Sequence, residues 1–476
     1  MVLPAHKTRI VATIGPACES EEALGRLIRA GMDVARLNFS HGDLAGHAER
    51  IGRIRAAERA AGRRVTVMAD LPGPKMRIGT VAPDPLQLAA GAEFTLTTAD
   101  VAGDASRAST TFARLPQVVS AGTRLFLNDG LVQLVVERVE GADVHCRVAV
   151  GGELRSRKGL NLPGVDLGIC AFTDRDRECL EFALAHGADA VSQSFVETAA
   201  DVEAVRAAAA ALGKRPFLVA KIERAGALEH LDAILAAADG IMVARGDLGV
   251  EVPIEEIAVT QKRLIAKANL AGKPVITATQ MLESMVSSRL PTRAEATDVA
   301  NAILDGTDCL MLSAESAVGR FPEEAVAMLA RIAAATEAHR PRAGLDGLRA
   351  LTRERGCGTV GEAVAAVVEN ALASVPCAAV FVPTHSGATA RRISRFKPPV
   401  WIVAVTWRPG VCAGLAFSHG VQALEVAAEP DDWRAFARRW LAEHEVPGDT
   451  AMLAAGPSHR HPDASHRIEF IRVGAS

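Results

Sequence analysis

Short apolar runs and longer amphipathic stretches alternate along the chain. The short runs are rich in Val, Ile, Leu and Ala, whereas stretches such as EEALGRLIRAG and ADVEAVRAAAAALG repeat their apolar residues at helical spacing. The runs are Arg9–Gly15, Asp33–Ser40, Val65–Leu71, Ala190–Phe195, Phe217–Glu223, Gly240–Gly249, Pro274–Gln280 and Cys309–Ser316. Eight strands, each followed by a helix, are the number that closes a (β/α)8 barrel, so we predict an α/β fold built on a TIM barrel.

Two parts of the chain break this pattern. Residues 73–163 are rich in Val, Leu, Thr and Gly with turn signals at NDG, VEGAD and VGGE, which predicts a small all-β insert, a β-barrel lid over the barrel mouth. The catalytic barrel then comprises residues 1–72 and 164–345. After a linker at 341–358, strands and helices alternate again, and residues 350–476 predict a separate open-sheet α/β domain with a regulatory role.

The composition argues against several classes of protein, among them nucleic-acid-binding, secreted and membrane proteins. The 476 residues exceed one ordinary core, and 53 Lys and Arg against 56 Asp and Glu give a net charge of −3, which argues against a broad nucleic-acid surface. The opening MVLPAHKTRI lacks the apolar core of a signal peptide, and charges interrupt the apolar stretches elsewhere. Eight scattered cysteines without a CxxC pair predict reduced thiols. We therefore expect a cytoplasmic protein that binds neither nucleic acid nor membranes.

Polar residues collect at the ends of the predicted strands, where this fold carries its chemistry. A single Ser or Thr there would be structural, but contributions from seven of the eight strands to one face predict an active site. The residues are Arg36, Asn38, Ser40, His41, Asp70, Ser194, Lys221, Glu223, Arg245, Gly246, Asp247, Thr279, Gln280, Ser313 and Glu315.

The fifth and sixth strands carry a candidate metal site. Lys221 and Glu223 are two residues apart on a strand and share a face, and Asp247 on the next strand can reach the same point. Carboxylates with water suit Mg²⁺ or Mn²⁺, and no Cys or His joins them to favour zinc. The segment Gly246–Gly249 opens a short helix whose N–H groups suit a carboxylate. A structural ion pair and a plain tight turn are the alternatives. With Arg36, the set fits a phosphorylated, carboxylate-bearing small molecule.

Longer motifs run through the same positions. They are TIGPA at Thr13–Ala17, ARLNFSHG at Ala35–Gly42, GPKMRIG at Gly73–Gly79, KGLNLPG at Lys158–Gly164, AKIE at Ala220–Glu223, MVARGDLGVEVP at Met242–Pro253, ATQMLESM at Ala278–Met285, PTRAEATDVANAILDG at Pro291–Gly306 and MLSAES at Met311–Ser316. In these motifs the chain resembles the pyruvate kinase family across barrel, lid and, less tightly, C-terminal domain. The resemblance implies a homotetrameric, magnesium-dependent enzyme that transfers the phosphoryl group of phosphoenolpyruvate to ADP, giving pyruvate and ATP in the last step of glycolysis.

The resemblance also implies roles for individual residues. The implied ligands of Mg²⁺, which Mn²⁺ can replace, are Glu223 and Asp247. The implied contacts of the phosphoryl group are Arg36 and Lys221. The substrate carboxylate is implied to meet the amides of Gly246 and Asp247 and the side chain of Thr279. The implied nucleotide side comprises Asn38, His41, Arg77 and Lys158. A water chain that protonates the enolate is implied near Thr279, Ser313 and Glu315.

One departure from the family bears on its monovalent cation. Many members need K⁺, held by the counterparts of Asn38, Ser40, Asp70 and the carbonyl of Leu71. Those members typically carry Thr in place of Leu71 and Glu in place of Lys75. The ammonium group of Lys75 can supply the same positive charge, so we predict activity without added K⁺. The alternative is a Lys75 side chain that points to solvent.

The C-terminal domain carries a candidate effector loop. Hydroxyls and amides of THSGAT, at Thr384, Ser386, Gly387 and Thr389, precede a predicted helix and resemble the family's effector-phosphate loop. An ordinary helix N-cap is the alternative. The segment GPSHRHPDASHR at 456–467 departs from the family's Gly-Thr-Thr-Asn-rich partner. The expectation of activation by a sugar phosphate thus rests on the THSGAT loop alone, and the identity of the sugar phosphate stays open.

Two other functions fit parts of the pattern. An aldolase or lyase with a Mg²⁺-enolate barrel would share the metal site but would need neither the lid nor the lid residues Arg77 and Lys158. A catalytically silent, binding-only relative would keep the fold. The argument against it is the intact catalytic set of Lys221, Glu223, Asp247 and Thr279. An assay with phosphoenolpyruvate and ADP separates the kinase from the lyase, and absence of ATP with Mg²⁺ would favour the binding-only relative.

Overall fold

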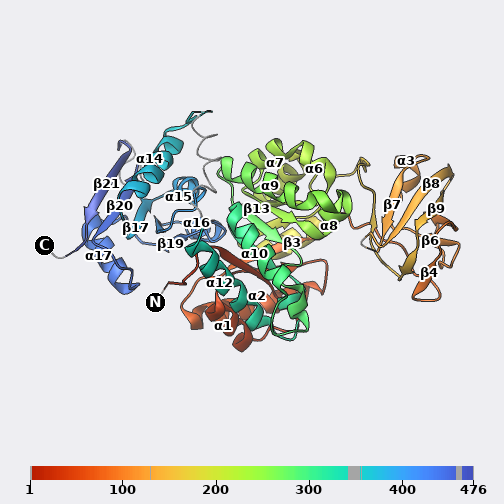
Figure 1. The fold of residues 1–476 in the computed structure, drawn as a ribbon, viewed down its shortest axis with the longest axis horizontal. Coiled ribbons are helices and arrows are strands. Elements are labelled where there is room, and N and C mark those ends of the chain that lie inside the picture. The colour runs from red at the N-terminus through yellow and green to blue at the C-terminus, as the bar shows by residue number, and fades with distance from the viewer. Residues whose placement is uncertain (1–2, 129, 341–353, 355, 457–463, 475–476) are drawn as a thin grey trace.

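The molecule consists of three bodies in a row, with the barrel between the C-terminal domain and the β-rich insert (Figure 1). The computed structural model describes residues 3–128, 130–340, 354, 356–456 and 464–474. Most of the predicted linker at 341–358 lies outside the described residues, as does most of the segment at 456–467. Among the described residues, no helix combines the length and apolar character needed to cross a membrane.

The predicted (β/α)8 barrel is confirmed. Its strands are β1 (Arg9–Thr13), β2 (Met32–Asn38), β3 (Thr66–Leu71), β12 (Ala190–Gln193), β13 (Phe217–Ile222), β14 (Gly240–Ala244), β15 (Val275–Ala278) and β16 (Cys309–Leu312). They close in the order β1-β16-β15-β14-β13-β12-β3-β2, and every pair is parallel. The barrel interior is filled by apolar side chains that include Val11, Val34, Met68, Met242 and Met311. All strand C-terminal ends therefore face the same side.

Helices surround the barrel because their apolar stripes pack on the strands. They are α1 (Glu21–Ala30), α2 (Leu44–Ala61), α4 (Asp174–Ala185), α5 (Ala199–Ala211), α6 (Ala225–Glu229), α7 (Leu231–Ala237), α8 (Arg245–Glu251), η1 (Ile254–Glu256), α9 (Ile257–Leu270), η2 (Glu283–Val286), α10 (Arg293–Asp305), α11 (Ala314–Ala317) and α12 (Pro322–Ala338). Side-chain caps fix several starts: Ser20 accepts from Ala23 N, and Thr292 and Glu295 form a capping box. The expected short helix after the sixth strand is α8.

The insert is built from β-strands and lies beyond the C-terminal ends of the barrel strands (Figure 1). Its elements are β4 (Leu86–Leu88), β5 (Glu93–Thr97), β6 (Arg107–Ser109), α3 (Leu115–Val118), β7 (Arg124–Leu127), β8 (Val132–Glu140), β9 (Asp143–Val150), β10 (Gly152–Leu154) and β11 (Leu160–Asn161). Six strands form one sheet in the order β11-β7-β8-β9-β5-β6, and β10 pairs with β4. Its separate apolar core includes Phe94, Leu125 and Leu134. We call this insert the lid.

The C-terminal domain has a five-stranded sheet in the order β19-β18-β17-β20-β21, in which only the edge strand β21 is antiparallel among the described pairs. Its elements are α14 (Val360–Ser374), β17 (Ala379–Pro383), α15 (Ala388–Ser394), β18 (Trp401–Thr406), α16 (Pro409–Leu415), β19 (Val421–Glu425), α17 (Trp433–Glu443), β20 (Thr450–Ala455) and β21 (Arg467–Arg472). The apolar runs CAAVFVP, VWIVAVT, TAMLAA and RIEFIRV predict four of these strands. The fifth, β19, was missed because its half-exposed sequence VQALE carries a weak apolar pattern.

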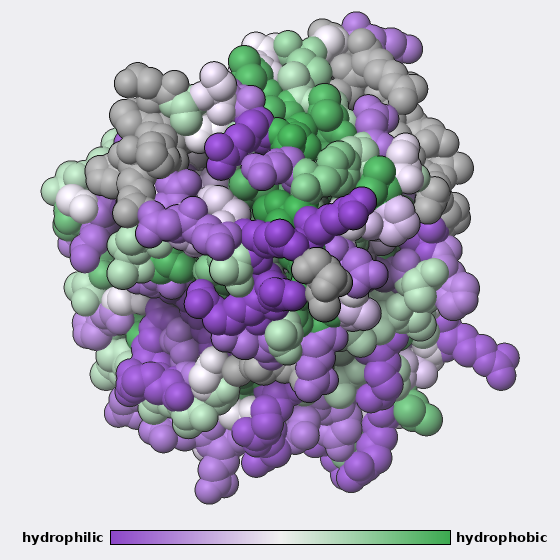
Figure 2. Space-filling model, turned by 90° about the vertical axis from the view of Figure 1, so that its left-hand side faces the viewer, coloured by the Kyte–Doolittle hydropathy of each residue, from purple (hydrophilic) through white to green (hydrophobic). Residues whose placement is uncertain are grey.

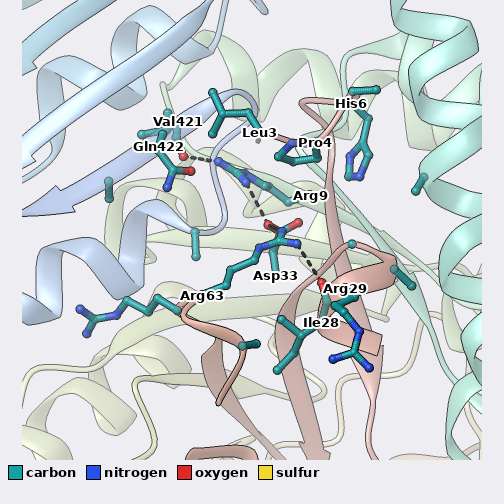
Figure 3. A pocket seen from close by; sticks show the side chains of 18 of the residues that line it. Leu3, Pro4, His6, Arg9, Ile28, Arg29, Asp33, Arg63, Val421 and Gln422 are labelled. Atoms are coloured by element: carbon teal, nitrogen blue, oxygen red, sulfur yellow. Dashed lines mark hydrogen bonds and ion pairs between the residues drawn. The ribbon is translucent and has the colours of Figure 1, made fainter. Parts of the chain in front are cut away.

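The C-terminal domain closes the N-terminal end of the barrel. Phe417 is fully buried among the barrel's interior side chains, and its ring stacks on that of Phe217 with centroids 5.0 Å apart. Beside this contact, a cavity of about 710 Å³ lies between the two domains (Figure 3). Two of the cations in its wall are already paired, because Asp33 lies 2.9 Å from Arg9 and 2.8 Å from Arg63. The lid lies at the opposite end, beside the barrel mouth (Figure 1).

Candidate active site

Lys221 lies at the centre of a buried cluster of charges at the barrel mouth. It is the last residue but one of β13, and its Nζ lies 2.9 Å from Glu223 Oε1, 3.4 Å from Asp70 and 2.7 Å from Ser194 Oγ. Only 8% of Lys221 is exposed. Burial lowers the pKa of the lysine, but Asp70 and Glu223 outweigh it and raise the pKa above its ordinary value. The side chain is therefore a fixed ammonium at neutral pH.

Asp70 joins Lys221 to a second cation, Arg36. The Arg36 guanidinium donates to Asp70 Oδ2 from Nε at 2.8 Å and to Thr13 Oγ1 at 2.8 Å. Ser192 Oγ donates to the other oxygen, Asp70 Oδ1, at 2.6 Å. Burial raises the pKa of Asp70, but Lys221 and Arg36 overcome this effect and bring the pKa to about 2. Asp70 therefore stays ionised and fixes two cations at the strand ends.

The two predicted metal ligands come from neighbouring strands. Glu223 follows β13 and is 1% exposed; its Oε2 accepts from Phe195 N at 2.7 Å, and Phe195 itself adopts φ 58. Asp247 lies in α8 directly after β14, which pairs with β13 through Ile222 and Val243. No group of three or more His, Cys, Asp or Glu side chains arranged for a metal occurs among the described residues. A site here consists of two carboxylates and would need other oxygen ligands.

The loop after β15 is held in an unusual conformation. Thr279 and Gln280 both have positive φ, at 67 and 53, where a side chain is disfavoured. Arg245 supports this loop, because it donates to Thr279 O at 2.8 Å and pairs with Asp298 at 2.7 Å. Gly246 N donates to Thr279 Oγ1 at 2.8 Å. The predicted carboxylate-binding residues Gly246 and Thr279 are therefore in direct contact.

Glu315 has a different setting from the other predicted catalytic residues. It is fully buried in α11, and its two oxygens accept from Ser313 N at 2.7 Å and from Leu282 N at 3.1 Å. These bonds join the loops that follow β15 and β16. Ser313 lies directly beyond β16 and is only partly buried. The contacts of Glu315 are those of a group that positions these loops.

The predicted nucleotide and K⁺ residues lie mainly between barrel and lid. A cavity of about 940 Å³ opens there, and the predicted residues in its wall are Ser40, His41, Lys75 and Arg77. Lys158 is not among the described residues that line it, although Arg77 pairs with its neighbour Gly159. Asn38 Oδ1 accepts from Ser40 N at 3.1 Å, and the Leu71 side chain is fully buried in the barrel core.

Lys75 is exposed to solvent but stands in a cationic part of this cavity. Partial burial lowers its pKa, as do the nearby charges of Lys221 and Arg77, whereas Asp70 and Asp247 raise it. The Lys75 ammonium is thus within electrostatic reach of the central cluster. The pKa of His41 is lowered by partial burial and then by Lys75 and Arg77.

The candidate effector loop precedes α15 in the C-terminal domain. Thr384 is buried and its Oγ1 accepts from Gly387 N at 2.9 Å. Ser386 is exposed, and its carbonyl accepts from Arg391 at 3.0 Å. Gly387 has φ 76, and an added Cβ would meet Arg391 and Leu415 at 2.8 and 3.0 Å. The loop therefore makes a tight turn, with an arginine beside it and Thr389 in the following helix.

Sequence reasoning missed several side chains of the central cluster. Thr13 and Ser192 were not identified, and Ser194 was noted without a role, although they bond Arg36, Asp70 and Lys221. A signal was present in AVSQSF, since Ser192 and Ser194 are two apart and project to the same side of a buried strand. Small hydroxyl residues are usually structural, so only the folded arrangement distinguishes these.

A closed barrel with fixed cations and carboxylates beneath an inserted lid defines a (β/α)8-barrel phosphotransferase. The family profile described as pyruvate kinase, barrel domain, matches residues 5–326, and that described as pyruvate kinase, alpha/beta domain, matches residues 362–465. The chain belongs to the pyruvate kinase family. Among curated relatives, the pyruvate kinase of Thermococcus litoralis is 49% identical over 88% of this chain and 89% of its own.

Two further relatives cover almost the whole chain. The pyruvate kinase of Mycobacterium tuberculosis is 44% identical over 98% of this chain and 99% of its own. A crystal structure of a Cryptosporidium parvum pyruvate kinase matches with a TM-score of 0.91 and 36% identity, covering 99% of this chain and 97% of that one. The predicted family, fold class and enzymatic function are thereby confirmed. The roles of individual residues and the domain boundaries stay predictions.

Proposed function

We propose that the enzyme moves the phosphoryl group of phosphoenolpyruvate to ADP at the barrel mouth, with Lys221 and Arg36 as the cations that contact this group. The observation that carries the proposal is the buried cluster in which Asp70 and Glu223 hold these cations in place. Phosphoryl transfer depends mainly on alignment and on neutralising charge. Buried, preorganised cations do this more effectively than exposed ones, because the surroundings screen them less.

Glu223 and Asp247 are the proposed holders of Mg²⁺. Their hard carboxylate oxygens suit this ion or Mn²⁺, and substrate oxygens and water would complete the coordination. When bound, the ion supplies positive charge at the phosphoryl and enolate oxygens. Lys221, 2.9 Å from Glu223 Oε1, keeps its ammonium beside the same carboxylate. The chain's own part is to hold these charges without rearrangement.

Thr279 and the amides of Gly246 and Asp247 are proposed to bind the substrate carboxylate. The bond between Gly246 N and Thr279 Oγ1 supports this, because it shows that the amide and the hydroxyl lie close enough to bind one carboxylate. Transfer leaves an enolate that must gain a proton on carbon. We propose that the hydroxyls of Thr279 and Ser313 guide this proton through water, and that Glu315 contributes through the loops it holds.

The ADP phosphates are proposed to lie in the cavity between barrel and lid. His41, Lys75 and Arg77 line it, and a concentration of basic groups suits a diphosphate. Asn38 and Lys158 are proposed to contact the nucleotide once the lid approaches, since neither lies in the wall of this cavity. The volume of about 940 Å³ is ample for a nucleotide.

Lys75 is proposed to replace K⁺. Of the four residues whose counterparts hold the ion, Asp70 already has both oxygens occupied by Arg36, Lys221 and Ser192. The electrostatic coupling of Lys75 to Lys221, Asp70 and Asp247 supports a side chain that acts on the site from the cavity. On this proposal the reaction needs a divalent cation but no added K⁺.

Metal removal tests the proposed chemistry. The rate of pyruvate formation from phosphoenolpyruvate and ADP can be monitored with lactate dehydrogenase as the coupling enzyme. This rate is expected to fall at least about 100-fold with excess EDTA and to return with Mg²⁺. Asp247→Asn should raise the half-saturating Mg²⁺ concentration about tenfold, because it removes one ligand charge. The exposed Asp232→Asn is the matched control. Full activity in EDTA would refute the metal site; no pyruvate with Mg²⁺ would favour the binding-only alternative.

The effector loop is proposed to bind the phosphate of a sugar phosphate. Exposed Ser386, the turn at Gly387 and the adjacent Arg391 support an anion site of this kind. We expect the half-saturating concentration of phosphoenolpyruvate to fall at least about threefold with one of three sugar phosphates: fructose 1,6-bisphosphate, glucose 6-phosphate or ribose 5-phosphate. Ser386→Glu should abolish this shift through charge repulsion while leaving basal kcat unchanged. No shift with any of the three would remove the proposal.

A homotetramer is also proposed, from the family resemblance. Exposed apolar residues on the C-terminal domain support self-association, among them Val360 and Val367 on α14 and Phe470 on the edge strand β21. On the face of this domain that is turned toward the viewer in Figure 2, apolar residues gather between polar ones. Sedimentation equilibrium should give four times 49.9 kDa, and a monomer mass would contradict the proposal. A cytoplasmic location stays a prediction.

A further inference from the structure

The lid is joined to the barrel by two chain segments, and one buried carboxylate binds both. The outgoing segment begins at Gly73 after β3, and the returning segment ends at Thr173 before α4. Asp176, in the first turn of α4, is fully buried. Its Oδ1 accepts from Gly73 N at 2.8 Å, and its Oδ2 accepts from Thr173 N at 2.8 Å. Residues 103 positions apart thus meet at a single side chain.

Asp176 does more than cap its own helix. Thr173 and Asp176 form a capping box, with Asp176 N donating to Thr173 Oγ1 at 3.1 Å. A capping box by itself uses only groups within one turn. At the start of α5, Asp201 also combines a box with a distant bond, because its Oδ1 accepts from Ala171 N of the returning connection at 2.8 Å, but among the described bonds it binds that connection alone. The bond from Asp176 Oδ1 to Gly73 N lies outside such a box. Each carboxylate oxygen of Asp176 therefore binds one connection of the lid: Oδ1 the outgoing one and Oδ2 the returning one.

The outgoing connection touches the catalytic cluster directly. Gly73 has φ 65, and a Cβ there would lie 2.9 Å from Phe195 Cδ2 and 3.0 Å from Ser194 O. Ser194 Oγ accepts from Lys221 at 2.7 Å, and Phe195 N donates to Glu223 Oε2 at 2.7 Å. Displacing Gly73 would therefore disturb the loop that positions both Lys221 and Glu223.

The returning connection is gripped farther along by longer side chains. Arg224 donates to Val165 O at 2.6 Å from the barrel, and Arg114 donates to Gly168 O from the lid. Both of these contacts lie on exposed or half-exposed backbone, whereas Asp176 is fully buried and its bond to Gly73 is buried with it. Movement of the lid can rearrange the outer contacts more readily than the buried ones.

We propose that Asp176 is a positioning residue: the fixed pivot of the lid, which anchors both of its connections and keeps the outgoing one seated against the Ser194–Phe195 loop. Lid motion then rotates the segments beyond Gly73 and before Thr173 while their ends stay bound. The lid residues reach the nucleotide at a repeatable position, and Lys221 and Glu223 are undisturbed by the motion. The kinetic part of this proposal rests on the proposed nucleotide contacts of the lid.

Asp176→Asn tests the pivot because an amide offers one acceptor where the carboxylate offers two, so one connection loses its bond. We expect the KM for ADP to rise about tenfold and kcat to fall about tenfold, with the KM for phosphoenolpyruvate changed less than about twofold. Hydrogen–deuterium exchange should speed up in peptides covering 72–78 and 165–173. The exposed neighbour Asp174→Asn is the matched control and should leave all of these unchanged.

Thr173→Val separates a pivot from a simple helix cap. This variant removes the Thr173 hydroxyl and weakens the cap but keeps both backbone bonds to Asp176. It should lower the melting temperature while leaving the KM for ADP near that of the parent. Equal kinetic effects in Thr173→Val and Asp176→Asn, or unchanged exchange of both connections in Asp176→Asn, would overturn the pivot.

A further variant covers failure of Asp176→Asn to fold. Thr173→Pro deletes the Thr173 N–H donor at a residue with φ −88, close to the range that proline adopts, and should speed exchange in the returning connection. Normal exchange there would equally overturn the proposal. Exchange is read without nucleotide, so faster exchange with an unchanged KM for ADP would keep the pivot and refute the nucleotide contacts instead.

Discussion

Lys221→Met is expected to lower kcat about 10³-fold, a loss of ~4 kcal/mol in transition-state stabilisation. The ammonium lies 2.9 Å from Glu223 and is held by Ser194, so its charge is in place before the reaction begins. The KM for ADP should change less than about threefold, because Lys221 lies in the barrel and the proposed ADP contacts lie toward the lid. Steady-state rates with both substrates varied, at saturating Mg²⁺, provide the measurement.

The controls separate chemistry from folding. Lys214→Met removes an exposed lysine and should leave kcat and stability unchanged. The pKa of Lys221 is raised, so its ammonium persists through the neutral range and its loss cannot be imitated by modestly raising the pH. A cooperative thermal transition in Lys221→Met would show that the variant still folds although Asp70 and Glu223 have lost the ammonium between them. A correctly folded Lys221→Met variant with normal kcat would contradict the proposal that Lys221 neutralises the charge of the phosphoryl group.

The barrel was predictable because its strands obey a strong local rule. Runs such as Val65–Leu71 and Phe217–Glu223 are apolar on both faces, as strands covered by helices must be, and each is followed by an amphipathic stretch. β19 (Val421–Glu425) does not obey this rule, since it is an edge strand with half-exposed side chains. Its pairing with β18 depends on neighbours that the local pattern does not contain.

The candidate site was predictable in position and less so in its connections. Strand ends identify Lys221 and Asp70 as facing the mouth, because parallel strands bring their C-terminal ends together. Sequence reasoning gave Asp70 to a K⁺ site, whereas in the structure its oxygens bond Arg36, Lys221 and Ser192. The K⁺ role itself stays a prediction.

Long-range bonds account for what sequence reasoning did not find. The TDRD segment at 173–176 shows a capping pattern, but nothing local reveals that Asp176 also binds Gly73. The same holds for Ser192 and Asp70, which lie 122 residues apart. Such contacts depend on strand order and register, and a one-residue shift would remove them.

Lys75→Glu is expected to convert the enzyme into one that needs K⁺. Without K⁺ the variant should lose at least about 100-fold in kcat, because the introduced carboxylate replaces a cation coupled to Lys221, Asp70 and Asp247. Adding KCl to about 0.1 M should restore most of this loss, whereas tetramethylammonium chloride at equal ionic strength should not. The parent enzyme, measured in a Tris buffer free of K⁺ and Na⁺, should change less than about twofold on either addition.

Lys75→Met distinguishes a missing positive charge from an added negative one. It removes the ammonium without creating an oxygen ligand, so its rate should fall while KCl restores little of it. A K⁺ response in Lys75→Glu alone would mean that the cavity can hold an ion once an extra carboxylate is present, and that Lys75 normally takes the place of that ion. If the parent rate itself rose many-fold with KCl, Lys75 would have no such role, and its charge would serve the nucleotide instead.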